Sequence, residues 1–227
     1  MVCYIKFQSA IWYTLSFILL FSANYFVANS SVMVASPMPK FCVVLDAGHG
    51  GVDTGAVSKN GVNERDINLS ITKKLGTMLD NFGFQVIYTR TTQDALYNDF
   101  SRGHKLKDMK KREEIIKNAN PNLVVSIHLN SFNSPTAKGA QVFYKPHDDF
   151  SQELAQNMQE VFVKNIEGSR VSPQEGDFYI LNCAPAGAVL IECGFLSNPE
   201  EEKQLINPQY QEKLAYYIMC GIVSYLN

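Results

Sequence analysis

The chain has 227 residues, of which 46% are hydrophobic and 19% are charged, so it can bury the core of one domain. Its net charge of -2 at pH 7 provides no basic surface, so we expect no nucleic acid among its partners. The 5 cysteines show no Cys-x-x-Cys spacing, and their odd number leaves at least one unpaired. We therefore expect buried thiols rather than a disulfide framework.

The first 39 residues differ from the rest of the chain. Lys6 is the only charged residue before Lys40, and it precedes an apolar run over residues 11–21 and then small residues. This order is typical of a secretory signal or of an uncleaved membrane anchor, and both interpretations stay open. We expect residues 1–39 to be this signal or anchor segment. Residues 40–227 would form an exported domain, either secreted or held at the membrane.

From residue 40 onward, segments with strand and helix periodicity alternate. Residues 66–80 show the apolar spacing of an amphipathic helix, whereas residues 41–46 form a short β-forming run. The predicted strands cover residues 41–46, 84–89, 123–128, 140–144, 178–181 and 188–192, and the predicted helices cover residues 66–80, 110–118, 152–164 and 208–226. This alternation predicts an α/β fold, a three-layer sandwich in which helices flank a mostly parallel central sheet of about six strands.

Four polar side chains come at the ends of these elements. His49 follows the first strand in a glycine-rich turn, His128 and Glu192 end later strands, and Glu64 precedes the first helix. Ligands of such sheets gather beyond the carboxyl ends of the strands. We therefore expect His49, His128 and Glu192 to share one crevice.

Two histidines and two glutamates suit metal-assisted hydrolysis. Zinc hydrolases bind the ion through three protein ligands, and a further carboxylate acts as the base. The spacing does not tell which glutamate is the ligand, and Glu64 has an alternative role because acidic residues stabilise the start of a helix. Glu192 follows four apolar residues, and burying an unpaired carboxylate is costly, which favours a functional role.

Four motifs extend this pattern over the whole of residues 40–227. VVLDAGHGG, NERDINLSI, VVSIHLNS and LIECGFLSNPEE occur in this order. They resemble the signatures of the zinc-dependent N-acetylmuramoyl-L-alanine amidases of the LytC-like branch. Within that family the chain is most similar to the germination-specific, CwlD-type amidases of spore formers, partly because FYILN precedes the last motif.

The resemblance implies a role for each matching residue. His49, Glu64 and His128 correspond to the ligands of one Zn²⁺ ion, and Glu192 corresponds to the catalytic glutamate. The implied reaction hydrolyses the amide bond between the lactyl group of N-acetylmuramic acid and the L-alanine of the stem peptide. The substrate would then be peptidoglycan, and the subfamily implies maturation of the spore cortex, with formation of muramic lactam.

The chain departs from many relatives at two positions. Leu129-Asn130 follows the second histidine where alanine is common, and Asn182 stands where arginine is common. Neither departure removes a ligand, so the departures concern substrate contacts, of which we predict Asn130 to be one. The segment between Tyr144 and Ser151 is too short for the plugging helix of some septal amidases. The resemblance also allows a protein partner, such as the lipoprotein that assists some clostridial relatives.

Other charged residues have simpler interpretations. We expect His104 and His147 to be solvated, and Arg90 and Arg112 to pair with acidic residues of the fold. The basic residues between 105 and 112 suggest a solvated helix face. Two alternatives to the amidase remain: another zinc-dependent cell-wall peptidase, such as a carboxypeptidase, and a non-catalytic wall-binding or regulatory protein.

Overall fold

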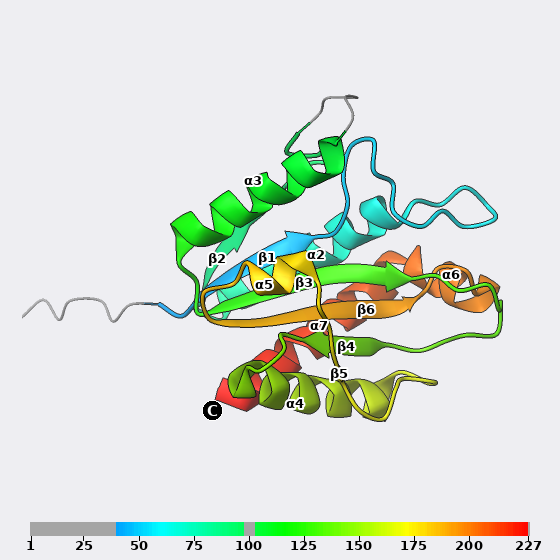
Figure 1. Cartoon of the computed structure of the whole chain (residues 1–227). Coiled ribbons are helices and arrows are strands. Elements are labelled where there is room, and N and C mark those ends of the chain that lie inside the picture. Colours follow the sequence, from blue (N-terminus) through cyan, green and yellow to red (C-terminus); the bar gives the residue numbers. More distant parts are fainter. Residues whose placement is uncertain (1–39, 98–102, 227) are drawn as a thin grey trace, which may run out of the picture. The chain divides into compact units, whose positions relative to one another are not determined.

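The centre of the domain is a six-stranded sheet (Figure 1). The computed structural model describes residues 40–97 and 103–226. The strands lie in the order β2-β1-β3-β6-β4-β5. Their bounds are Cys42–Ala47 (β1), Gln85–Tyr88 (β2), Leu123–Asn130 (β3), Gln141–Tyr144 (β4), Gln174–Glu175 (β5) and Gly187–Phe195 (β6). Neighbouring strands are parallel except β4 and β6, which are antiparallel.

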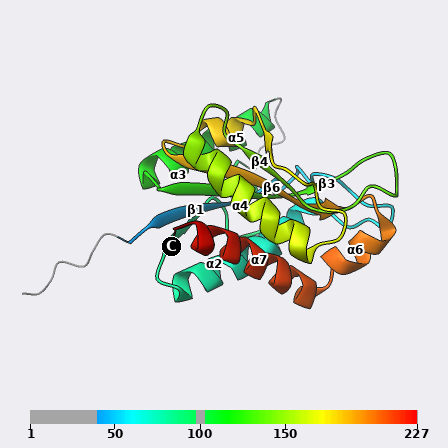
Figure 2. The same ribbon diagram turned by 90° about the horizontal axis from the view of Figure 1, so that it is seen from below.

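Helices cover both faces of this sheet. On one face α2 (Glu64–Asn81), α4 (Asp149–Asn165) and α7 (Pro208–Leu226) form a layer, which Figure 2 shows in front of the strands. On the other face α3 (His104–Ala119) packs against β1, and α5 (Tyr179–Asn182) packs against β6. The short helix α6 (Pro199–Leu205) follows β6. The predicted three-layer α/β fold with a mostly parallel sheet is therefore confirmed.

The alternation of side chains along the strands sorts residues to the two faces. In β3, Val125 and Ile127 belong to the large apolar cluster under α2, α4 and α7, whereas Val124 belongs to the smaller cluster under α3 and α5. The same alternation places His128 on the α3 face. Glu192 is its register partner in the parallel strand β6, so both polar side chains emerge on the same face.

Three details of the sequence prediction were wrong. Residues 178–181 do not form a strand, because Tyr179–Asn182 is a short helix whose consecutive residues Ile180 and Leu181 are buried, and the sixth strand is Gln174–Glu175. Helix α3 begins at His104, directly after a left-handed Gly103, and not at residue 110. The third detail is α6, which was not predicted.

The structure also bears on several smaller expectations. Residues 145–148 join β4 directly to α4, so no helix is inserted there, as predicted. Cys42 and Cys193 are buried free thiols, and Cys183 and Cys220 are half-buried free thiols. The predicted signal or anchor over residues 1–39 and Cys3 lie outside the described residues. Across residues 40–97 and 103–226, no helix has the length and apolar character to cross a membrane.

Candidate metal centre and active site

His49 lies in a strained turn just beyond the carboxyl end of β1. Its φ of 63° falls in the left-handed region, which is costly for a residue with a side chain and is found mostly where the surroundings enforce it. The N–H of Gly48 donates to the carbonyl of Ile127 at 3.0 Å, which ties the turn to β3. Nη2 of Arg112 donates to the carbonyl of His49 at 2.5 Å. The turn is therefore fixed on both sides of the histidine.

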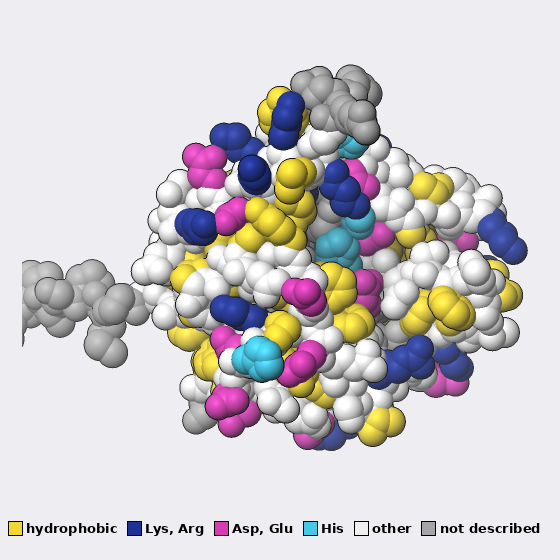
Figure 3. Space-filling view, in the orientation of Figure 1, with side chains coloured by type: hydrophobic (Ala, Val, Ile, Leu, Met, Phe, Trp, Pro, Cys, Tyr) yellow, Lys and Arg dark blue, Asp and Glu magenta, His cyan; other side chains and the backbone are white. Residues whose placement is uncertain are grey.

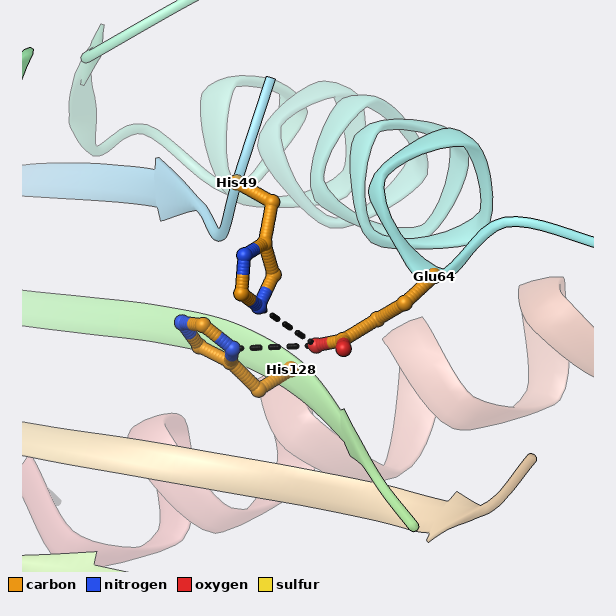
Figure 4. Close-up of side chains that lie close together, drawn as sticks. All are labelled: His49, Glu64 and His128. Atoms are coloured by element: carbon orange, nitrogen blue, oxygen red, sulfur yellow. Dashed lines mark hydrogen bonds and ion pairs between the residues drawn. The ribbon is translucent and has the colours of Figure 1, made fainter. Parts of the chain in front are cut away.

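Three side chains from separate elements converge beside this turn (Figure 4). Nε2 of His49 lies 3.2 Å from Oε1 of Glu64, and Nδ1 of His128 lies 3.0 Å from the same oxygen. The three ligand atoms all lie within 4.8 Å of one another. Zinc binds nitrogen and oxygen ligands at about 2.0–2.2 Å, which places two ligands of a tetrahedral ion roughly 3.4 Å apart. The donor types and their spacing therefore fit one zinc ion.

A second group of contacts orients these three side chains. Oδ2 of Asp53 lies 3.0 Å from Nδ1 of His49, so the ring donates there and leaves Nε2 free to bind a metal. Glu64 accepts from the N–H of Ala56 at 2.8 Å through Oε2 and from the N–H of Leu129 at 3.0 Å through Oε1. These bonds tie Glu64 to the loop before α2 and to β3.

The charges of the cluster shift its pKa values. Burial alone would raise the pKa of Glu64, but the bonds with His128 and His49 outweigh it and hold that pKa well below its usual range. Burial alone would lower the pKa of His49, but the contacts with Asp53 and Glu64 raise it to about 9. Protons and a metal ion therefore compete for the same nitrogen and oxygen atoms.

Two glycines make room for the cluster. A Cβ on Gly48 would lie 2.3 Å from the ring of His128, so only glycine allows this contact. A Cβ on Gly55 would lie 2.5 Å from Oε2 of Glu64, and Gly55 also has a left-handed φ of 65°. Close backbone approach is thus part of how these three side chains are brought together.

Glu192 faces the cluster from the neighbouring strand. Adjacent strands are about 4.8 Å apart, and Glu192 is the register partner of His128. Its Oε2 is buried without a hydrogen-bond partner among the described residues. Burial, together with the charge of Glu64, raises the pKa of Glu192 to about 7 despite the opposing effect of His128 and His49. A carboxyl group with such a pKa both accepts and donates a proton near neutral pH.

A cavity opens over these residues, and Figure 3 shows histidine and acidic side chains together in the hollow near the centre of the view. His49, His128 and Glu192 line it together with apolar side chains from α3, α5 and β6, among them Met109, Ile180 and Leu190. Predominantly apolar walls with a few convergent polar groups are typical of ligand sites.

Comparison with known families matches residues 43–224 to the N-acetylmuramoyl-L-alanine amidase family. The chain belongs to this family. The germination-specific N-acetylmuramoyl-L-alanine amidase of Bacillus subtilis is 33% identical to it over 214 residues, which cover 92% of this chain and 90% of that protein.

Solved amidase structures show the same fold. The CwlD amidase of Clostridioides difficile, determined in complex with the GerS lipoprotein, superimposes with a TM-score of 0.78 at 41% identity, over 82% of this chain and 98% of that one. An N-acetylmuramoyl-L-alanine amidase of Clostridium difficile 630 gives a TM-score of 0.74 at 37% identity, over 83% of this chain and 98% of that one. The predicted resemblance to CwlD-type amidases is thereby confirmed.

Several other predicted residues of the amidase lie elsewhere. Asn130 is at the end of β3, where its carbonyl accepts from the N–H of Leu196 at 2.8 Å, and its side chain is not among those that line the cavity. Its role in substrate binding stays a prediction. Asn182 donates to Asp177 at 2.8 Å. His147 is exposed as predicted, whereas His104 is half-buried and lines the cavity.

Buried charged residues lie behind the turn that carries His49. Arg112 is 1% exposed and pairs with Asp46 at 2.6 Å and with Asp108 at 2.8 Å, so the predicted pairing with acidic residues is confirmed for Arg112. The predicted solvated face was wrong at Arg112 and Asp108, which are buried. Arg90 also differs from the prediction, because it donates to backbone carbonyls and none of the ion pairs among the described residues includes it. The positions of these carbonyls depend on how the backbone folds, so the sequence pattern could not predict them.

Proposed function

We propose that this amidase is zinc-dependent and cleaves the amide bond between the lactyl group of N-acetylmuramic acid and L-alanine in peptidoglycan. The observation that carries the proposal is the convergence of His49, Glu64 and His128 beside a buried, unpartnered carboxyl group of Glu192. Family membership supplies the bond that is cut, and the donor set supports the metal.

In this proposal, His49, Glu64 and His128 would hold one Zn²⁺ ion. Bound zinc supplies Lewis acidity, which polarises a carbonyl group and lowers the pKa of water. Asp53 keeps the proton of His49 on Nδ1, and the N–H groups of Ala56 and Leu129 hold the Glu64 carboxylate in place. These contacts fix the ligands before the substrate arrives.

Glu192 is the proposed proton carrier. Its carboxylate takes a proton from the attacking water while the oxygen of that water bonds to the lactyl carbonyl carbon. The carbon–nitrogen bond then breaks, and Glu192 gives the proton to the departing nitrogen of L-alanine. A pKa of about 7, set by burial, suits both steps because the group changes charge easily near neutral pH.

We further propose that the amidase acts outside the cytoplasm on spore cortex peptidoglycan, where its products would allow muramic lactam to form. The germination-specific relative and the CwlD amidase support this setting. Residues 1–39 would direct export of the catalytic domain over residues 40–227, as a cleaved signal or as a membrane anchor. The complex of CwlD with the GerS lipoprotein supports a lipoprotein or other protein partner for this chain.

The test is digestion of purified muropeptides by the full-length chain, purified with a mild detergent, with zinc and after chelation. Mass spectrometry identifies the products, and Glu192→Gln is the matched variant because it keeps the shape of the side chain but cannot carry the proton. We expect zinc-dependent release of a stem peptide with a free alanine amine. General acid–base catalysis typically contributes about 10²- to 10⁴-fold, so Glu192→Gln should lose activity on that scale while still binding zinc.

Other products separate the alternatives. Release of a terminal D-amino acid would indicate a carboxypeptidase, and binding of glycan without cleavage would indicate a wall-binding protein. Zinc binding without cleavage by the purified chain would point to a required protein partner. Absence of both zinc binding and cleavage would contradict the proposed site.

A further inference from the structure

Arg90 is a buried guanidinium that contacts two of the segments that carry the proposed zinc ligands. It follows β2 and is 3% exposed. Its Nη2 donates to the carbonyl of Gly48 at 2.9 Å and to the carbonyl of Arg65 at 2.8 Å. Gly48 immediately precedes His49, and Arg65 immediately follows Glu64. One nitrogen atom therefore bridges the backbone beside both ligands.

Two further bonds fix the guanidinium itself. Nε of Arg90 donates to the carbonyl of Ala47 at 2.9 Å, and Nη1 donates to the carbonyl of Thr92 at 2.9 Å. The planar fork of arginine has five N–H donors, and four bonds from three nitrogens need such a fork. Lysine carries the same charge, but its three donors sit on one atom and cannot reach carbonyls on several sides.

The third ligand is coupled to the same contact. Gly48, whose carbonyl accepts from Arg90, packs so closely on His128 that a Cβ would lie 2.3 Å from its ring. Asn68 adds a parallel link, because its Nδ2 lies 3.3 Å from the carbonyl of Gly48 and 3.1 Å from Oε1 of Glu64. A shift of Gly48 would therefore disturb all three side chains together.

Burying the charged guanidinium of Arg90 in these surroundings costs free energy, which an apolar side chain at the same position would not. Among the described residues, no carboxylate forms an ion pair with Arg90, and a buried charge without such a partner is expensive. Burial and then the neighbouring charge of Arg112 lower the pKa of Arg90 to about 10, although the charges of Asp46, Asp108 and Asp66 act in the opposite direction. An apolar side chain would fill this space more cheaply but could not hold four carbonyls.

We propose that Arg90 is a positioning residue of the metal centre: its guanidinium sets the distance between His49 and Glu64 by holding the carbonyls of Gly48 and Arg65. This inference rests on the proposed function, in which these side chains bind zinc. It assigns Arg90 no contact with the substrate, so loss of the fork should weaken zinc binding and leave the fully loaded enzyme active.

The experiment compares Arg90→Lys with the wild type as full-length protein in detergent. The zinc dissociation constant is measured by chelator competition well below the unfolding temperature, and the absorption spectrum of the cobalt-substituted protein reports ligand geometry. Arg170→Lys is the matched chemical control, because it makes the same substitution at an exposed arginine, one that lies over the ring of Phe195. Ile218→Val is the stability control, because Ile218 is buried in α7 on the other face of the sheet.

We expect Arg90→Lys to weaken zinc binding about 10- to 100-fold, as for other residues that orient metal ligands, and to change the cobalt spectrum. Its kcat should return towards that of the wild type at saturating zinc. Both controls should keep the affinity of the wild type, even if Ile218→Val lowers the melting temperature. Arg90→Gln, which removes the charge and keeps an amide donor, replaces Arg90→Lys if that variant does not fold.

The outcomes separate this inference from the proposed function. Zinc affinity and a cobalt spectrum equal to those of the wild type would overturn the positioning role and leave the zinc site standing. A fall in affinity of the same size in Ile218→Val would also overturn it, because the effect would then follow from general stability. Failure of both Arg90 variants to fold would assign the residue to the fold instead. A wild type that binds no zinc would contradict the proposed function itself.

Discussion

The carboxyl edge of the sheet and the face under α2, α4 and α7 are built in opposite ways. The face under α2, α4 and α7 holds a large apolar cluster, in which side chains such as Ile71, Leu154 and Ile218 are fully buried. The edge beside α3 instead buries charges, among them Arg90 and Arg112, and keeps His49 in a left-handed conformation.

This difference separates stability from site geometry. Apolar packing stabilises folding in proportion to the area it removes from water, without requiring exact directions. The edge depends on directed bonds between polar groups, which are costly if a partner is lost. Changes within this apolar cluster should therefore alter stability alone, and changes at the edge should alter the proposed zinc binding first.

The largest effect should come from loss of a ligand at the edge. His128→Ala should abolish zinc binding and lower activity on the order of 10³-fold or more, because the metal supplies several kcal/mol of transition-state stabilisation. Metal content and muropeptide turnover measure this change. His147→Ala is the control, because His147 is exposed in the loop after the antiparallel strand β4. Equal zinc content in both variants would contradict the ligand role.

A large-to-small substitution within the apolar cluster should give the complementary result. Leu154 is 0% exposed in α4, so Leu154→Ala should lower the free energy of unfolding by about 2–5 kcal/mol through lost burial and a cavity. Denaturant unfolding gives this number, and chelator competition on the folded protein should give unchanged zinc affinity. Weakened zinc binding in this variant would show that the two regions are not separate.

Gly48 tests how closely the edge is packed. Gly48→Ala places a Cβ 2.3 Å from the ring of His128, so the ligand must move, and we expect zinc affinity to fall roughly 10- to 100-fold. Gly61→Ala is the control because nothing lies within 4 Å of its Cβ, although its φ of 81° makes that alanine mildly strained. The comparison fails if both variants bind zinc as the wild type does.

The smallest predicted effect is on the free energy of unfolding at low pH, and it arises from Asp46. Burial raises its pKa, but Arg112 and the hydroxyl groups of Thr89 and Ser126 outweigh it and lower the pKa to about 2. Because the folded pKa lies below the unfolded value of about 3.9, this contribution is complete above about pH 5 and disappears as the pH falls through 2. It amounts to roughly 2 kcal/mol.

Denaturant unfolding at pH 5 and at pH 2.5 measures this change. Asp46→Asn should be less stable at pH 5 but should lose less stability between the two pH values than the wild type. Identical losses in the two proteins would show that Asp46 does not titrate in this range.

The sequence predicted those parts of the structure that depend on periodicity. Alternating apolar residues located the main strands, and the rule for parallel sheets placed His49, His128 and Glu192 at one edge. Residues 178–181 were misassigned because a short apolar run suits a buried strand and a buried helix equally well. Helix α6 has only 7 residues, too few for a periodic pattern, although Asn198 before Pro199 is a helix-start signal that accepts from the N–H groups of Glu200 and Glu201.

The supporting contacts of the site could not be predicted in the same way. Arg90 binds backbone carbonyls, and every residue of the sequence carries one, so no side-chain pattern marks its partners. The contact of Asp53 with His49 could not be predicted either, because it depends on how the glycine-rich turn folds back. Sequence patterns locate the proposed ligands, but the groups that orient them follow from the three-dimensional path of the backbone.

The most direct test of the central claim is a crystal structure of the zinc-loaded protein with anomalous scattering measured at the zinc absorption edge. We predict one anomalous peak within about 2.0–2.2 Å of Nε2 of His49, Oε1 of Glu64 and Nδ1 of His128. The carboxyl group of Glu192 should face the peak without binding it. A peak bound by Glu192 in place of Glu64, or no peak in this cavity, would contradict the account.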